Sequence, residues 1–406
     1  MELKQGYKQT EVGVIPEEWN ICFLHQVCER VTVGLATSVT QYYRKSGVPL
    51  VRNLNIRDGF FDGRDMLYVT EAFARVNQSK AAKASDVLIV HTGANLGDAC
   101  VLPSEFDNCQ TFTTLIITPK PRALTPQFLC LHMGSFSGRG EMSRLEVGGG
   151  KGNLNTGDLK NYRISVPPLP EQHAIAAALK DVDALITSLD QLIAKKRDLK
   201  QAAMQQLFTG NRRLSGFTSD WETKRLGEIA KLTMGRTPSR LNRAFWGRGH
   251  KWLSIADLKS KVISQGAEEI TDLAASEMTV VPKGTLLMSF KLTIGRICFA
   301  GCDLFTNEAI CAFHNLQADA QFLYYALGRI DFSIYGKQAV KGYTLNADSL
   351  QQVEVHLPHI DEQTAIANVL SDMDAEITAL EARRDKTHAL KQGMMQELLT
   401  GRTRLV

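Results

Sequence analysis

The sequence predicts an α+β fold in which two mixed α/β globules are joined by two long helices that form an antiparallel coiled coil. Three observations predict it. One segment of the chain occurs twice, each copy has the pattern of a single long helix, and the regions outside the copies resemble each other weakly. Because an internal repeat of this kind builds one structural unit per copy, we expect a pseudo-twofold, cyclic arrangement of globule, helix, globule and helix.

The repeat itself is close. Residues 172–214 and 363–405 align without a gap and share 22 identical residues over 43 positions. Chance does not supply half identity over such a length, so both copies should have the same structure.

Each copy is predicted to be one helix. Prolines and carboxylates stand before both copies, at 167–171 and 358–362, where a helix start favours them. Gly210 and Gly401 follow, where a glycine commonly ends a helix. Apolar residues recur at alternating steps of four and three, which is the heptad pattern of a coiled coil. They are Ile175, Leu179, Val182, Ile186 and Leu189 in the first copy, and Ile366, Leu370, Met373, Ile377 and Leu380 in the second.

The charges along the two helices favour an antiparallel pair. Acidic residues such as Asp183 and Asp374 come early in each copy, and basic residues such as Lys196 and Arg384 come late. Antiparallel packing sets the acidic part of one helix beside the basic part of the other, whereas parallel packing brings like charges together. The alternative is a long helix with a solvated charged face.

The remaining segments give the domain boundaries. Residues 20–165 and 222–356 are the two expected globules, 166–221 and 357–406 the helical spacers, and 1–19 a segment that closes the repeat with the C-terminus. The globules share short matching pieces: Trp19 and Trp221, Gln127-Phe128-Leu129 and Gln321-Phe322-Leu323, and Leu154-Asn155 and Leu345-Asn346.

Composition and missing motifs exclude several classes. The 406 residues are 44% hydrophobic and 22% charged, contain no apolar run of about 18 residues, and begin without the layout of a secretory signal, so we expect a cytoplasmic protein. The eight cysteines form no CxxC pair or zinc spacing and are expected to be reduced and packed, with no metal site. Phosphate-loop, GxGxxG, GxSxG and HExxH motifs are missing, so we expect neither catalysis nor a bound cofactor.

Two divergent modules held at a fixed spacing are expected to bind two different sites on one extended ligand, and the extended ligand that best matches this arrangement is duplex DNA. Each globule has a long stretch without acidic residues, although a solvated basic face would look the same. Arginine and lysine neutralise phosphate or bind guanine, and asparagine reads adenine. The candidate DNA contacts are Tyr42, Arg44, Lys45, Arg52, Asn53, Asn55 and Arg57 in the first globule, and Arg236, Thr237, Ser239, Arg240, Arg243, Arg248 and Lys251 in the second. Two basic loops, which could also be ordinary strand connections, add Lys151 and Asn153, and Lys341 and Tyr343.

Several motifs carry a family resemblance. They are Pro-Leu-Pro-Glu-Gln-His-Ala-Ile-Ala at 168–176, Ile-Asp-Glu-Gln-Thr-Ala-Ile-Ala at 360–367, Gln-Leu-Phe-Thr-Gly at 206–210, Glu-Leu-Leu-Thr-Gly at 397–401 and Gly-Val-Ile-Pro-Glu-Glu-Trp at 13–19. With these motifs the whole chain resembles the specificity subunit of type I restriction-modification systems. The second copy departs from the first in having His-Ile where the first has Pro-Leu.

The resemblance implies a non-enzymatic subunit with two target-recognition domains, each reading half of a bipartite, asymmetric DNA sequence in the major groove. It implies two modification subunits that bind S-adenosylmethionine and methylate adenine, and a core that two restriction-translocase subunits using ATP and Mg²⁺ can join. Composition and periodicity show none of these partners. Two other readings remain: a self-sufficient DNA methyltransferase or nuclease, and a coiled-coil adaptor without a role on DNA.

Overall fold

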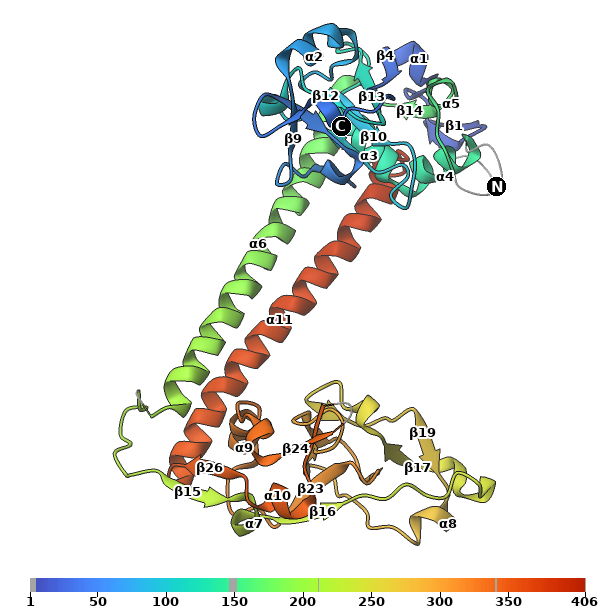
Figure 1. The fold of residues 1–406 in the computed structure, drawn as a ribbon. Helices are drawn as coiled ribbons and strands as arrows, with labels where there is room; N and C mark the ends of the chain where they lie inside the picture. The colour runs from blue at the N-terminus through green and yellow to red at the C-terminus, as the bar shows by residue number, and fades with distance from the viewer. Residues whose placement is uncertain (1–4, 146–151, 211, 340–341, 406) are drawn as a thin grey trace. The chain divides into compact units, whose positions relative to one another are not determined.

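The computed structural model describes residues 5–145, 152–210, 212–339 and 342–405. They form two units, the first drawn from residues 1–191 and 381–406 and the second from 192–380. Each unit contains one globule and one part of each long helix (Figure 1). The unit limits fall inside the helices, so the boundaries 20–165 and 222–356 of the recognition domains stay a prediction.

The first unit is built around two four-stranded sheets. One has the order β11-β10-β13-β4, with β4 (Cys28–Val33), β10 (Val87–Val90), β11 (Ala99–Val101) and β13 (Thr114–Pro119), all antiparallel. The other has the order β12-β6-β9-β5, with β5 (Tyr43–Arg44), β6 (Val48–Val51), β9 (Leu67–Val69) and β12 (Gln110–Thr111). Every side chain of β10 is buried, which explains its unbroken apolar sequence.

Short helices and hairpins complete this unit. Its helices are α1 (Leu24–Val27), α2 (Glu71–Val76), α3 (Pro126–Gly134), α4 (Phe136–Leu145) and α5 (Thr156–Lys160). Two-stranded pairs join β1 (Tyr7–Thr10) to β2 (Gly13–Pro16), β3 (Asn20–Phe23) to β14 (Arg163–Val166), and β7 (Ile56–Arg57) to β8 (Phe60–Phe61). Helix α3 begins where Thr125 accepts a hydrogen bond from the Phe128 amide, with Pro126 in the first turn.

The second unit repeats this plan. Its larger sheet has the order β16-β23-β20-β21-β18, with β16 (Lys231–Met234), β18 (Val262–Ile263), β20 (Leu286–Ser289), β21 (Ile297–Ala300) and β23 (Ile310–His314). Its smaller sheet has the order β19-β17-β22, with β17 (Trp246–Leu253), β19 (Glu268–Ile270) and β22 (Phe305–Thr306). In both units a parallel pair, β6 with β12 or β17 with β22, lies in the sheet that does not contain β10 or β20. The weak sequence similarity between the globules therefore reflects a shared fold.

Short helices and two-stranded pairs also complete the second unit. Its helices are α7 (Leu226–Ile229), α8 (Asp272–Ala275), α9 (Ala320–Leu327) and α10 (Ala347–Gln351). Two-stranded pairs join β15 (Glu222–Arg225) to β26 (Glu354–Leu357), and β24 (Lys337–Ala339) to β25 (Gly342–Thr344).

The two repeat copies are the long helices α6 (Leu169–Phe208) and α11 (Ile360–Leu398) (Figure 1). In the first unit Lys391 pairs with Asp183 at 2.5 Å, and in the second Lys196 pairs with Glu376 at 2.7 Å. Arg384 with Asp190 and Lys200 with Asp374 continue the two series. Along each series of ion pairs the residue numbers increase on α6 while they decrease on α11, which confirms that the helices are antiparallel within each unit.

The heptad residues form the buried side of these helices. Those that are buried are Ile175, Leu179, Ile186, Leu189, Ile366, Leu370 and Ile377, and those that are partly buried are Val182, Met373 and Leu380. The first positions of each helix also belong to a globule core: Ile175 and Leu179 pack with the first, and Ile366 and Leu370 with the second. The heptad pattern thus serves two contacts, one to the partner helix and one to the globule.

A buried carboxylate joins the segments of each unit, and we call these two contacts the carboxylate clasps. Glu171, fully buried, accepts hydrogen bonds from Trp19 Nε1 at 2.9 Å and from both Nε and a terminal nitrogen of Arg404. Glu362 accepts two bonds of 2.6 Å from Arg213 in the same way. The first clasp brings together the two ends of the chain, as the cyclic arrangement predicts.

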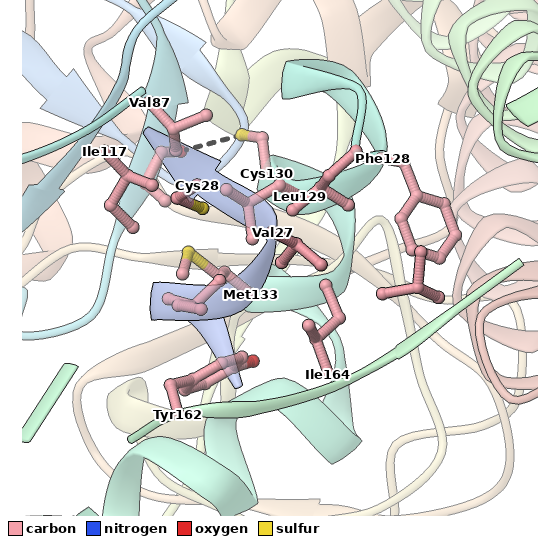
Figure 2. Close-up of a cluster of buried hydrophobic side chains, with 14 of the residues drawn as sticks. Val27, Cys28, Val87, Ile117, Phe128, Leu129, Cys130, Met133, Tyr162 and Ile164 are labelled. Carbon is pink, nitrogen blue, oxygen red and sulfur yellow. Dashed lines mark hydrogen bonds between the residues drawn. The ribbon is translucent and has the colours of Figure 1, made fainter. Parts of the chain in front are cut away.

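The first core contains a buried histidine. Side chains of α1, α3 and β14 meet there, including Val27, Met133 and Ile164 (Figure 2). His132 is buried beside them, and its Nδ1 lies 2.9 Å from the hydroxyl of Tyr162. Burial disfavours the charged imidazolium and lowers the pKa of His132 to about 4.

We expect His132 to make the protein sensitive to acid. Between pH 6.5 and 4 the unfolded chain binds a proton at this residue and the folded chain does not, so stability falls as the pH falls, by about 3 kcal/mol in total. His132→Gln should flatten this dependence in urea unfolding measured across that range, and the exposed His388→Gln should leave it unchanged. An unaltered slope in His132→Gln would contradict the assignment.

None of the helices in the described part of the chain is long and apolar enough to cross a membrane.

Candidate nucleic-acid interface

In the second unit the basic stretch is organised around Arg240. Its guanidinium lies 3.8 Å from the ring centroid of Trp246 and 5.3 Å from that of Trp252, within the range of cation–π contacts. Two hydrogen bonds of 2.6 and 2.8 Å join it to Glu268 of β19. The arginine is therefore held in one orientation, although its side chain remains half exposed.

The neighbouring strand and helix supply the acidic residues that the stretch itself lacks. Lys251 pairs with Glu269, and His250 lies 2.7 Å from Asp272. The hydrogen bond from Arg240 lowers the pKa of Glu268, and the one from Lys251 lowers the pKa of Glu269. The surface is therefore less positive than the sequence of residues 236–252 predicts.

Two arginines of the stretch differ from the rest. Arg243, in a short 3-10 turn, and Arg248, on β17, are both exposed. Neither forms an ion pair with any residue that the structure describes. Of the other candidates, Arg236 is 4.0 Å from Glu277, Thr237 donates to Glu308, and the Ser239 carbonyl accepts from Trp246 Nε1. Arg243 and Arg248 are thus the two cations most available to a phosphate backbone.

In the first unit two candidate cations lie on the edge strand β5 and directly after it. Arg44 and Lys45 are exposed, and Arg44 is turned along the backbone by bonds to the carbonyls of Gln41 and Tyr43. Tyr42 stacks on Phe73 at 4.1 Å between ring centroids, so its ring supports this edge. The structure brings these three candidates together.

Four candidates lie in the turn of residues 52–57, and the structure argues against one of them, Asn55, as a DNA contact. Asn55 is 2% exposed, its Oδ1 accepts from the Arg52 amide, and its Nδ2 donates to the Asp62 carbonyl. In the corresponding turn of the second unit, the carboxylate of Asp257 accepts hydrogen bonds from the backbone amides of Ser254 and Ala267. Asn55 has no free amide edge for a base, so we remove it from the proposed contacts.

The other candidates of this turn are less enclosed. Asn53 and Arg57 are partly exposed, and so is Arg52, which donates to the Asp65 carbonyl.

Parts of the two basic loops, including Lys151 and Lys341, lie outside the residues that the structure describes. Tyr343 is on β25, paired in register with Gln338 of β24. Asn153 Oδ1 lies 3.3 Å from His91 Nδ1, beside the loop that follows β10. In the second unit the amide of Leu345 donates a hydrogen bond to the carbonyl of Phe290, the residue that follows β20. The segments that follow the two loops therefore contact equivalent positions.

One exposed residue near this region was missed. Leu292, between β20 and β21, is 68% exposed and has a left-handed backbone with φ of 63°. The corresponding residue of the first unit is Gly93, with φ of 93°, for which this conformation carries no strain. Sequence reasoning could have found the position by aligning Val87–Gly97 with Leu286–Gly295.

The described residues contain no cluster of three or more potential metal ligands. Six of the eight cysteines are buried, and burial raises the pKa of Cys28, Cys109 and Cys298 to about 12, which keeps these thiols protonated.

Comparisons with known proteins agree on one family. Residues 16–196 and 218–388 match the type I restriction modification DNA specificity domain. The chain is 21% identical to the type I restriction enzyme MjaVIII specificity subunit of Methanocaldococcus jannaschii, covering 99% of this chain and 97% of that one. It is 23% identical to the EcoKI specificity subunit of Escherichia coli K12, over 66% of this chain and 59% of that one.

Solved structures share the fold. One, from work on complex assembly and conformational transition of the type I R-M system, has a TM-score of 0.63 at 19% identity, with 96% of this chain and 99% of that chain covered. The HsdS subunit from Thermoanaerobacter tengcongensis has a TM-score of 0.55 at 19% identity, with 96% and 98% covered. Because the family match takes in most of both units, the chain belongs to the type I restriction-modification DNA specificity family and is a specificity subunit with two such domains.

Proposed function

We propose that each unit reads one half of a bipartite, asymmetric sequence in duplex DNA. One observation carries the proposal: the two units keep the same strand frame but present different side chains from it. In the second unit Arg240 lies over the ring of Trp246 and near that of Trp252, whereas the first unit has the Tyr42–Phe73 stack and the exposed Arg44. Different surfaces on equal frames suit different half-sites.

The chain would act within a larger complex. Two modification subunits would dock along α6 and α11 and methylate adenine with S-adenosylmethionine, and restriction-translocase subunits would supply ATP- and Mg²⁺-dependent cleavage. Extrusion of the target base then belongs to the modification subunits. The chain itself would need no cofactor and would act on DNA in the cytoplasm.

The test is to purify the chain with its modification subunit and measure methylation genome-wide. We expect one modified motif with two specified halves and an unspecified gap, and duplex binding that weakens steeply with salt. Methyl transfer by the chain alone would support a self-sufficient enzyme, and failure to bind any duplex at low salt would support an adaptor.

Exchanging one module should change one half-site. Replacing residues 20–165 with the same module of another specificity subunit is expected to alter one half of the methylated motif and leave the other intact, because each unit has its own core. Methylome sequencing gives the result directly. The control is the matching exchange of residues 222–356, and a change in both halves from either exchange would contradict modular reading.

The helices are proposed to set the gap between the half-sites. Inserting four residues after Ser188 and after Ala379 adds about 6 Å to each helix. At about 3.4 Å per base pair the unspecified gap should lengthen by one or two pairs. The measurement is again the methylated motif, and the control is an insertion in α6 alone, which breaks the pairing and should reduce methylation. An unchanged gap with full activity would remove the spacer role.

A further inference from the structure

In the second unit the space between α9 and α11 is filled by side chains of the unit itself. The hydroxyl of Tyr325 donates to Asp374 Oδ2 at 2.5 Å and lies 3.4 Å from Ser371 Oγ. Lys261 Nζ donates to the same hydroxyl at 2.9 Å and lies over the rings of Tyr324 and Tyr325. A tyrosine with its hydroxyl on a helix carboxylate therefore closes this space.

The first unit has the same frame with smaller side chains. Gln127-Phe128-Leu129 of α3 corresponds to Gln321-Phe322-Leu323 of α9, so Cys130 and Leu131 take the places of Tyr324 and Tyr325. Gly59 takes the place of Lys261, since each stands four residues after the equivalent turn residues Asn55 and Asp257.

The carboxylate at the base of the space is retained. Asp183 and Lys391 correspond to Asp374 and Lys200, and they form the same ion pair. The Asp183 side chain is 47% exposed, against 29% for Asp374. Within the described part of the chain, Lys391 is the one residue that pairs with the Asp183 carboxylate, and it does so through Oδ1. The Oδ2 that accepts the tyrosine hydroxyl in the second unit is thus open in the first.

The smaller side chains leave a cavity of about 500 Å³ between α3 and α6. Its lining is mostly apolar and includes Leu131, Cys130 and Ala177, with Lys180, Asp183 and Lys391 among its charged residues. Its volume falls within the range of about 300–1,000 Å³ that is usual for binding pockets. This volume and apolar lining suit an aromatic ring, whose hydroxyl would bond the free oxygen of Asp183 as that of Tyr325 bonds Asp374. We call this cavity the α3–α6 pocket.

We propose that the α3–α6 pocket receives a tyrosine side chain of a modification subunit. The proposal rests on the proposed function, because it takes the partner from there. The second unit shows which occupant the frame accepts, a phenol on a helix carboxylate, and the first unit keeps the carboxylate while lacking the phenol. A tyrosine anchored in a pocket commonly dominates the binding energy of an interface.

The main test fills the pocket from within. Leu131→Tyr rebuilds the arrangement of the second unit, and it is expected to weaken about tenfold or more the binding of the modification subunit that docks at the first unit, as measured by isothermal titration calorimetry. Leu131→Met, which conserves volume, is the matched control and should bind like the unmodified chain. Circular dichroism checks folding. If Leu131→Tyr fails to fold, Ala177→Trp on the exposed face of α6 blocks the pocket mouth instead.

A second readout uses p-cresol, which is the tyrosine side chain as a free molecule. In saturation-transfer NMR we expect p-cresol to bind the unmodified chain and not Leu131→Tyr. The proposal would be overturned if both blocking variants bound the modification subunit as tightly as the unmodified chain does. This holds even if p-cresol binds the unmodified chain, because the pocket would then serve a small aromatic ligand.

Failure of this inference can be told from failure of the proposed function. Complexes assembled at saturating modification subunit should keep their DNA sequence preference with Leu131→Tyr, because the substitution leaves every proposed DNA contact unchanged and acts through assembly. A lack of sequence preference in the unmodified complex would instead count against DNA reading itself.

Discussion

Arg404→Ala is expected to destabilise the first unit by about 3–5 kcal/mol, the usual cost of leaving one partner of a buried ion pair alone. Glu171 is fully buried, and among the residues that the structure describes its carboxylate accepts hydrogen bonds from Trp19 and Arg404 alone. Removing the guanidinium leaves a buried carboxylate with one neutral donor. Urea unfolding followed by tryptophan fluorescence should show the early transition, since Trp19 lies at the clasp.

Two companion variants sharpen this prediction. Arg402→Ala removes an exposed arginine that lies 3.6 Å from Glu397, and it should change stability by less than about 1 kcal/mol. Arg213→Ala breaks the second clasp and should destabilise the second unit by a similar amount to Arg404→Ala, because Glu362 is 1% exposed. Equal stability of Arg404→Ala and Arg402→Ala would show that the clasp contributes nothing.

Reversing two charges in the second unit should reduce DNA affinity about 100-fold. Arg243→Glu with Arg248→Glu converts two exposed arginines without ion-pair partners in the described chain into repelling carboxylates. If both neutralise phosphates, the slope of log affinity against log salt should also fall by about 2. Fluorescence anisotropy with the methylated motif as the duplex measures both quantities in the assembled complex.

The control changes the net charge equally at other sites. Lys283→Glu with Arg402→Glu alters two exposed basic residues outside the acid-free stretches and should reduce affinity less than about threefold. An equal loss in the two double variants would mean that net charge, and not this surface, governs binding.

The long helices were predictable because their signals are local. Heptad spacing, proline and carboxylates before the start and Gly401 after the end are all read within one segment, and Gly401 indeed has a left-handed φ of 72°. The antiparallel direction also followed from charges that repeat along each copy, and the Lys391–Asp183 pair confirms it.

The details of the candidate interface were not predictable because they depend on contacts far apart in the sequence. Glu268 lies 28 positions from Arg240, and only the pairing of β17 with β19 brings it there. Asn55 has the chemistry of an adenine reader, yet its burial follows from the turn that encloses it. A stretch without acidic residues therefore indicates a basic surface only where the neighbouring strand is also free of them.

The first clasp also fixes the order in which the protein is completed during synthesis. Residues 192–380 contain the entire second unit, whereas the first unit needs residues 381–406 and the Arg404 side chain. As the ribosome proceeds, the later unit has all its parts before the earlier one does. We therefore expect the apolar surface around Trp19 to stay uncovered in the nascent protein until residues 381–406 have emerged.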